Sequence, residues 1–282
     1  MRWRFKAATY ELAKKEGECV VISSGVVTGV FRSMQHNPTG REIVRRTFPG
    51  SQIRISEADN PLGYSCASVL INKMYAWKGY GSGFRVGDRR DQLTLVATDQ
   101  QSEQPIGTLS VGVDSGNKLL VDRLYADEAD QLRAKKCRLS EMTKFAIERH
   151  VNSKHLLAVL FHTAFIYSYH LRGATDLLIE VNPSHVSFYK RLLHFEAYGE
   201  EKMNPRVSAP SVLLWLSLDH AAAMIRQHGG QCDASSDRSL YPYFFSPGEE
   251  REIRQSLNAN GRREEGFTEI HSELEEATLC AA

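Results

Sequence analysis

The chain has 282 residues, of which 42% are hydrophobic and 24% are charged, and its formal net charge is +1. This composition is typical of a globular chain and excludes disorder throughout, and the length has room for one large domain or two small ones. The near-zero net charge argues against a general nucleic-acid binder, because neutralising phosphates requires a sustained excess of Lys and Arg.

The five cysteines are scattered without the paired spacing of a metal site, and an odd number fits a reducing compartment. We therefore expect a cytoplasmic protein without a metal centre. The N-terminal cations are not followed by a clean apolar run, so no secretory signal is expected. The most apolar stretch, residues 155–171, is shorter than the roughly 20 residues that a bilayer span needs, so it predicts a buried helix and no stable membrane insertion.

The first half of the chain begins with a variable N-terminal leader over residues 1–50. Residues 51–60 predict a strand that ends in a helix cap, and residues 61–77 carry apolar side chains at helical spacing. Two β-rich runs, DQLTLVATD and PIGTLSVGVD, predict a hairpin. The next segment, KLLVDRLYAD, is predicted to be a third strand.

The second half of the chain is predicted to contain both helices and strands. Ser140 is a predicted helix N-cap, and Glu141 opens an amphipathic helix. The buried helix comes next, and it is followed by the strand TDLLIEV, by a helix that Pro183 helps to start, and by two strands, FEAYGE and PSVLLWLSLD. Residues 51–222 are therefore predicted to form one α/β domain with a mixed sheet, and residues 223–282 an acidic, partly flexible tail.

A dense basic cluster precedes Ser140. Its members, with one cation beyond it, are Arg133, Lys135, Lys136, Arg138 and Lys144. Most such charge runs are solvated faces without a specific partner. The cluster contains no glycine, so side chains would block the close backbone approach that a nucleotide pyrophosphate needs. Lys and Arg side chains suit an acidic protein surface better, which they can steer and orient.

Several blocks of sequence resemble a known superfamily. TDLLIEVNPSHVSFYKRLLHFEAYG resembles the C-terminal half of the GNAT acyltransferase fold, with His194 where that pattern usually has Gly. The blocks NKMYAWKGYG, PIGTLSVGVDS, RLSEMTKFAI, IEVNPSHVSFYKRLL and NPRVSAPSVLLWL resemble, in this order, the N-acyl amino acid synthases, which are relatives of the acyl-homoserine-lactone (autoinducer) synthases. The resemblance covers about residues 52–220 and implies a GNAT-like fold whose mixed sheet is mostly antiparallel and flanked by helices.

The resemblance also implies an activity, in which a fatty acyl group moves from an acyl carrier protein thioester to the α-amino group of an amino acid. Acyl-phosphopantetheine is then a co-substrate and no cofactor is bound, and the basic cluster becomes a docking site for the acidic carrier. Two departures bear on the acceptor. Lys144 replaces an Arg of the autoinducer synthases, and Leu109 and Ser110 stand where those enzymes have another Arg, which counts against S-adenosylmethionine.

The expected chemistry points to two carboxylates. Attack on a thioester needs a neutral amine, and since an α-amino group has a pKa near about 8, a carboxylate that takes its proton is useful. Glu141 and Asp122 are the candidates, and their structural alternatives are a helix-terminal residue paired with Lys144 and a strand-end cap. Backbone N–H groups of Leu124 and Tyr125 would hold the oxyanion of the tetrahedral intermediate.

Three further residues are candidates for binding the acceptor. Arg206 could clamp its carboxylate by a bidentate contact, or could be an ordinary loop residue. Asn182 follows a strand end, where ligands bind in open α/β sheets, although it could equally cap the next helix. His162 lies on the apolar helix, where a lone His is more often a core residue. Phe161, Phe165 and Tyr169 could line an acyl slot or belong to the core.

Two other classes of function stay open at this point. One is a GNAT enzyme that uses acetyl-coenzyme A, or an enzyme like the acyl-homoserine-lactone synthases. The other is a non-catalytic acyl-binding module, because a fold does not fix a function.

Overall fold

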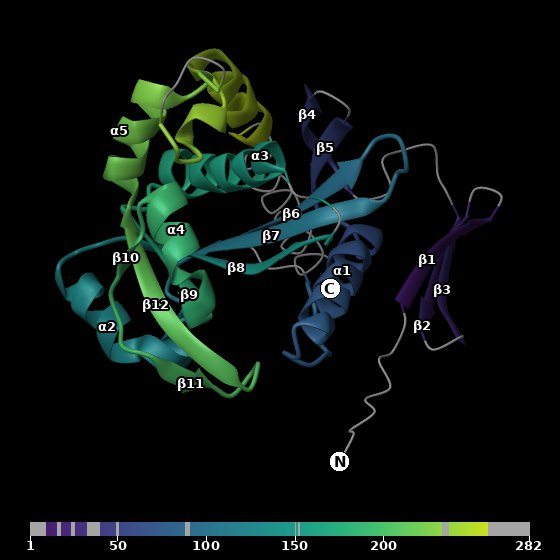
Figure 1. Ribbon diagram of the computed structural model, residues 1–282, viewed down its shortest axis with the longest axis horizontal. Helices are drawn as coiled ribbons and strands as arrows, with labels where there is room; N and C mark the ends of the chain where they lie inside the picture. Colours follow the sequence, from purple (N-terminus) through teal and green to yellow (C-terminus); the bar gives the residue numbers. More distant parts are fainter. Residues whose placement is uncertain are drawn as a thin grey trace, which may run out of the picture.

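The computed structural model describes residues 10–15, 18–23, 26–32, 40–48, 51–87, 91–149, 151, 153–232 and 237–258 (Figure 1). A nine-stranded sheet runs in the order β10-β12-β9-β8-β7-β6-β5-β4, and β11 pairs with β12. Its strands are β4 (Glu42–Phe48), β5 (Ser51–Glu57), β6 (Gln92–Asp99), β7 (Pro105–Val113), β8 (Leu139–Ile147), β9 (Asp176–Val181), β10 (Glu196–Ala197), β11 (Lys202–Asn204) and β12 (Ala209–Ser217). The strands β1 (Tyr10–Lys15), β2 (Glu18–Ser23) and β3 (Val26–Arg32) form an antiparallel sheet of their own.

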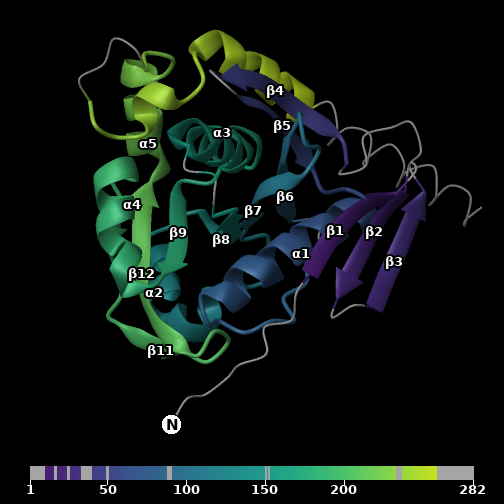
Figure 2. The same cartoon turned by 45° about the vertical axis from the view of Figure 1, so that its right-hand side comes forward.

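Helices cover both faces of the main sheet. They are α1 (Pro61–Trp77), α2 (Asp122–Ala134), α3 (Lys154–Phe165), which continues as the π-helix η1 (Ile166–Leu171), the 3₁₀ turn η2 (Pro183–His185), α4 (Val186–Leu193), α5 (Leu218–His228) and the 3₁₀ turn η3 (Tyr241–Tyr243). Because successive strand residues point to opposite faces, the sheet builds two separate sets of core contacts. Leu177 and Ile179 pack with α3, α4 and α5, whereas Leu178 between them packs with α2. Figures 1 and 2 show α1 and α3 on opposite sides of β6, β7 and β8.

The strands β8 and β9 are parallel and diverge after a short pairing. Their register runs from Leu139↔Asp176 to Met142↔Ile179, although both strands continue beyond it. Beyond Met142 the backbone of Lys144 has a positive φ of 51°, and the register between β7 and β8 shifts nearby, which is the signature of a β-bulge. The bulge bends β8, so its second half follows β7 and leaves β9.

Most predicted elements are confirmed, including the mixed, mostly antiparallel sheet. The cap at Asn60 is confirmed too, since its side-chain oxygen accepts a hydrogen bond from the N–H of Gly63 at 2.8 Å. The predictions for residues 118–127 and 139–147 were wrong, because the first segment leads into helix α2 and the second is strand β8. Ser140 and Glu141 therefore lie on a central strand and not on a helix.

The folded core extends at both ends beyond residues 51–222, the predicted bounds of the α/β domain. At the N-terminal side, β4 pairs with β5, so the sheet begins inside the predicted leader. At the C-terminal side, Leu240, Tyr241, Phe244 and Phe245 are buried in the same core as α3, and residues 247–258 form a further helix. The rest of the predicted leader and tail lies partly outside the described residues. Within the described ranges, no helix combines the length and the apolar character that crossing a membrane requires.

Candidate functional site

The gap between β8 and β9 opens toward the carboxyl ends of these strands, and residues from several elements lie around it. Tyr75 comes from α1 and Tyr189 from α4, two helices on opposite faces of the sheet. Burial raises the pKa of the Tyr189 hydroxyl, and Tyr75 is near enough to raise it further. Burial also raises the pKa of Tyr75 to about 12, against the opposing effect of the nearby Arg206 guanidinium. The two helices thus approach each other where the sheet has opened.

Glu180 is an acidic residue at this opening that the sequence reasoning missed. It follows Ile179, the last residue of β9 paired with β8. Its Oε2 accepts hydrogen bonds from Asn204 Nδ2 at 2.6 Å and from Ser211 Oγ at 3.5 Å, and Arg206 Nη2 lies 3.4 Å from its Oε1. Burial raises the pKa of the Glu180 carboxyl, while Arg206, Asn204 and Ser211 act to lower it. The signal in the sequence was an acid flanked by apolar residues inside the strand DLLIEV.

Glu141 fixes the start of α2. Its carboxylate accepts hydrogen bonds from the backbone N–H groups of Leu120 at 2.8 Å and Val121 at 3.0 Å. These donors immediately precede α2, which begins at Asp122 and has Val121 as its N-cap. Burial raises the pKa of Glu141, and the two backbone hydrogen bonds oppose that effect. Glu141 therefore holds the backbone that leads into α2, and a role in proton transfer stays a prediction.

Asp122 is a poor candidate for a base in this structure. Arg133 holds its carboxylate with two contacts, Nη1 to Oδ1 at 2.5 Å and Nη2 to Oδ2 at 2.8 Å, and the N–H of Leu119 adds a third. Burial alone would raise the pKa of Asp122, but these contacts outweigh it and lower the pKa. A carboxylate with a lowered pKa is a weaker proton acceptor, so these contacts do not favour Asp122 as the base, and its catalytic role stays a prediction.

Leu124 and Tyr125 lie on α2 and not on the predicted strand, and the prediction that their N–H groups hold an oxyanion stays a prediction. The N–H groups of both donate to the carbonyl of Val121 within α2, at 3.1 and 2.8 Å. The buried Tyr125 side chain instead links α2 to the sheet, because its hydroxyl lies 2.7 Å from the carbonyl oxygen of Ser211.

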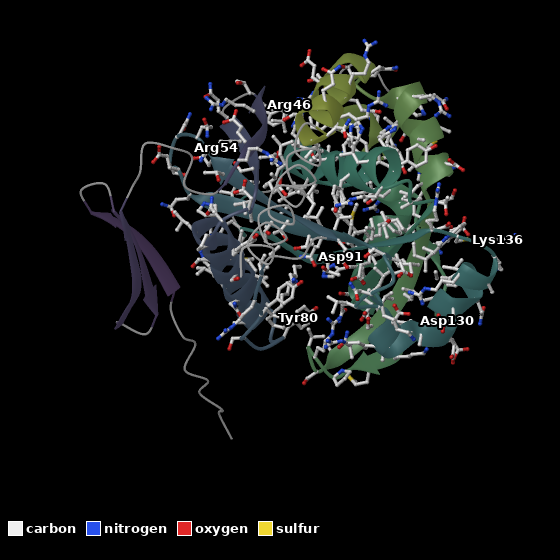
Figure 3. The ribbon with its side chains drawn as sticks, turned by 180° about the vertical axis from the view of Figure 1, so that it is seen from behind. Arg46, Arg54, Tyr80, Asp91, Asp130 and Lys136 are labelled. Carbon is white, nitrogen blue, oxygen red and sulfur yellow. The ribbon has the colours of Figure 1, made fainter. Side chains whose placement is uncertain are left out.

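The predicted docking cluster is divided among several places. Arg133 is neutralised by Asp114, Asp122 and Asp130. Lys135, Lys136 and Arg138 are exposed, but they belong to the turn between α2 and β8, at the end of β8 where it still pairs with β9. Lys144 lies farther along β8. Figure 3 shows Lys136 far from Tyr80, which follows α1. Lys135, Lys136 and Arg138 therefore do not border the opening between the strands, whereas Lys144 lies at the bulge where β8 leaves β9.

Two predicted acceptor residues, Asn182 and His162, form contacts of the structural kind that was their alternative interpretation, and their acceptor roles stay predictions. Asn182 Oδ1 accepts hydrogen bonds from the N–H of Ser184 at 3.1 Å and from its hydroxyl at 2.7 Å, so Asn182 caps the following turn. His162 is 0% exposed, and its Nδ1 accepts the N–H of Phe245 at 2.9 Å. Its Nε2 therefore carries the proton and donates to Glu250 Oε2 at 3.1 Å. Arg206 is the one predicted acceptor residue beside the opening.

Two hollows lie near helices α4 and α5. Phe161 and Phe165 line an apolar cavity of about 20 Å³ between α3, α4 and α5. Because this volume is close to that of one water molecule, an acyl chain would enter only if the surrounding side chains moved. A larger hollow of about 450 Å³ lies at the β10 edge, beside His194 and His220. Among the described residues, no group of three His, Cys, Asp or Glu side chains is arranged to hold a metal ion.

Comparisons with known proteins agree with this architecture. The family model described as N-acyl amino acid synthase FeeM matches residues 66–217, more than half of the chain. The solved structure of FeeM, an N-acyl amino acid synthase from uncultured soil microbes, is 23% identical with a TM-score of 0.54, and the match covers 63% of this chain and 96% of that one. A putative N-acetyltransferase from Lactobacillus plantarum is 16% identical with a TM-score of 0.43, covering 59% and 98%. No curated protein matches the chain.

The His162 contacts predict a pH dependence of stability. Burial lowers the pKa of His162 below 6.5, so the unfolded chain binds this proton more readily and acid favours unfolding. Burial would raise the pKa of Glu250, but the hydrogen bonds from His162 and His170 hold it at about 2, so its contribution is lost as the pH falls from 4.5 toward 2. We expect urea unfolding to show a decrease in the free energy of unfolding as the pH is lowered below about 6.5.

The control is His162→Gln, which does not titrate in this range. This variant should be less stable at neutral pH but should have a flatter pH profile between about pH 7 and 5. An equally steep profile in the variant would mean that other groups cause the acid sensitivity.

Proposed function

We propose that this chain, which belongs to the FeeM family of N-acyl amino acid synthases, moves a fatty acyl group from a carrier-bound phosphopantetheine thioester to the α-amino group of an amino acid. The observation that carries the proposal is the divergence of β8 from β9 beyond Met142 and Ile179. The second half of β8 pairs with β7 on one side, and its other side faces the gap. An extended chain with amide groups can bind such a strand edge as an added strand does.

A phosphopantetheine arm suits this gap. The arm is long and thin, it contains two amide groups, and it carries the acyl thioester at its tip. Backbone groups of β8 can pair with the amides, so the thioester would reach the level of Glu180 and Tyr189. Tyr189 has a raised pKa and therefore keeps its proton, so its hydroxyl could donate a hydrogen bond to the leaving thiolate while the thiolate takes its proton from elsewhere.

Arg206 supports an amino acid as acceptor. Its side chain is one-third exposed, at 34%, and its guanidinium lies beside the Glu180 carboxylate. A guanidinium binds a carboxylate through two parallel hydrogen bonds, so it distinguishes an amino acid from a simple amine.

Turnover with matched donors tests the function. The protein should be incubated with mixed amino acids and one acyl group presented on an acyl carrier protein, on coenzyme A or on pantetheine, and mass spectrometry should identify the products. We expect N-acyl amino acids, formed fastest from the carrier. Acetylated amines formed only from acetyl-coenzyme A would contradict the proposed substrates, and no transfer from any thioester would reject the activity.

The role of Arg206 gives a second prediction. Arg206→Lys keeps the charge but loses the bidentate geometry, so we expect the KM for the amino acid to rise about tenfold or more. The KM for the acyl donor should change little. Steady-state kinetics with each substrate varied in turn measures both constants, and an equal rise in the two would point to a general distortion of the site.

A basic and aromatic rim beside the gap offers a docking surface for an acidic carrier. Trp77 at the end of α1 is 51% exposed. The Arg149 guanidinium lies 4.0 Å and the Lys78 ammonium 5.0 Å from the centre of its ring. Arg149 follows the end of β8, and Lys78 interacts electrostatically with His185 just after β9. The two cations therefore border both diverging strands, unlike the turn that contains Lys135 and Lys136.

Charge reversal can compare the two surfaces. We expect the double change Lys78→Glu and Arg149→Glu to raise the KM for the acyl carrier thioester about tenfold or more at low salt, and less at high salt. Acyl-pantetheine, which lacks the carrier protein, serves as the second donor, and its KM should change little. The matched control is Lys135→Glu with Lys136→Glu, which should have little effect. The opposite pattern would restore the predicted docking role of Lys135 and Lys136.

A further inference from the structure

Asp122, Glu141 and Glu180 are three of the carboxylates near α2, and they differ in how firmly their oxygens are held. Asp122 is held by Arg133 on both oxygens. Glu141 accepts a backbone hydrogen bond on each oxygen. Glu180 differs, because Asn204 and Ser211 contact only its Oε2, and its Oε1 has the long 3.4 Å contact to Arg206. A ligand could displace that contact without leaving a buried hydrogen bond broken.

We infer that Glu180 is the group that takes the proton from the amino group of the acceptor while Arg206 binds the acceptor's carboxylate. This inference rests on the proposed function. In an α-amino acid the amino group and the carboxylate are attached to the same carbon, so a carboxylate on the Arg206 guanidinium brings the ammonium group beside the neighbouring Glu180. The pair therefore presents one positive and one negative group to a ligand with the opposite arrangement.

The surroundings of Glu180 adjust its basicity. Arg206 from the turn before β12 faces it with a positive charge, Glu141 on β8 interacts with it as a like charge, and the Tyr125 hydroxyl on α2 lies within its electrostatic range. Burial raises the pKa of Glu180 and is the largest of these effects. A carboxylate with a raised pKa is a better proton acceptor near neutral pH.

The proton and electron balance is simple. The ammonium group gives one proton to the Glu180 carboxylate, and the lone pair so freed forms the C–N bond with the thioester carbonyl carbon. When the C–S bond breaks, the sulfur leaves with the electron pair of that bond. The nitrogen loses a second proton to its surroundings, and the thiolate takes up one proton from its surroundings to become a thiol, so these two transfers cancel. Glu180 then releases its proton to solvent, and no oxidant or reductant is needed.

Asn204 and Ser211 act as positioning residues in this arrangement. Both hold Oε2, and both belong to the β11–β12 pair, in which Asn204 is opposite Ala209. Asn204 Oδ1 also accepts the backbone N–H of Arg206 at 2.9 Å. One amide side chain thus sets the position of Glu180 and of the turn that carries Arg206.

The test is the pH dependence of N-acyl product formation by Glu180→Gln. Without a base the enzyme can use only the neutral amine, whose fraction rises about tenfold per pH unit below its pKa near about 8. We expect the variant to lose about 10²-fold or more in kcat/KM for the amino acid at neutral pH. The loss should shrink as the pH rises, because the rate of the variant should follow the neutral amine up to about pH 8, and the inflection that reports Glu180 in the wild-type profile should be absent. Glu180→Asp should keep that inflection at a reduced rate.

Glu128→Gln is the matched control. Glu128 is similarly buried, at 17% side-chain exposure against 12% for Glu180, and it is paired with Lys202 at 2.7 Å. This variant should keep the wild-type pH profile. A wild-type rate for Glu180→Gln, or a loss that is equal at every pH in a protein that unfolds normally on heating, would overturn the inference. Failure of the wild-type protein to acylate any amino acid would instead overturn the proposed function itself.

Discussion

The short parallel pairing of β8 with β9 is the constraint on which the remaining architecture depends. Parallel strands cannot be joined by a tight turn, so the chain must cross over through a helix, here α3. The bulge at Lys144 then turns β8 away after only four residue pairs. A sheet that stayed paired to its end would separate α1 from α4 completely. Because it opens, Tyr75 and Tyr189 from the two faces come within electrostatic range of each other, and Arg206 from the β11–β12 turn comes within range of Tyr75.

Several charged groups near the opening between β8 and β9 form contacts that stabilise the fold. Glu141 satisfies the backbone at the start of α2, and Arg133 joins Asp114, Asp122 and Asp130 around the same helix. Buried charges are tolerated when they are paired or hydrogen-bonded in this way. Their role in holding α2 on the sheet explains why strongly charged residues appear in a segment that the family resemblance alone would assign to catalysis.

In each element that was predicted correctly, the apolar residues keep one spacing from end to end. The hairpin of β6 and β7 and the helices α1 and α3 are of this kind, and Asn60 and Ser153 cap the two helices as their side chains suggest. The segment that forms β8 was wrongly predicted to be a helix, and the bulge is one reason. Leu139 and Met142 are buried on opposite faces of the strand, and the bulge between Thr143 and Ala146 changes the alternation, so that Leu139, Met142 and Ala146 have the spacing of a helix although they lie on a strand.

The opposite error concerns α2. Leu119 to Val121 resemble a strand, and the helical spacing of Val121, Tyr125, Ala129 and Leu132 becomes visible only over a longer window. The site was predicted in part for a related reason. Arg206 could be identified from its residue type, but the importance of Glu180 depends on Asn204 and Ser211, which come from strands distant in the sequence.

The contacts of His162 also constrain the order in which the molecule can be assembled during synthesis. Its partner Glu250 is 88 residues farther along the chain, and the aromatic rings of Phe244 and Phe245 stack on the imidazole. A ribosome therefore releases α3 well before the segment that covers it. Until that segment arrives, an apolar helix surface and a polar imidazole stay open to water and to chaperones. The central sheet can form first, but the molecule closes only when nearly all the described chain has been made.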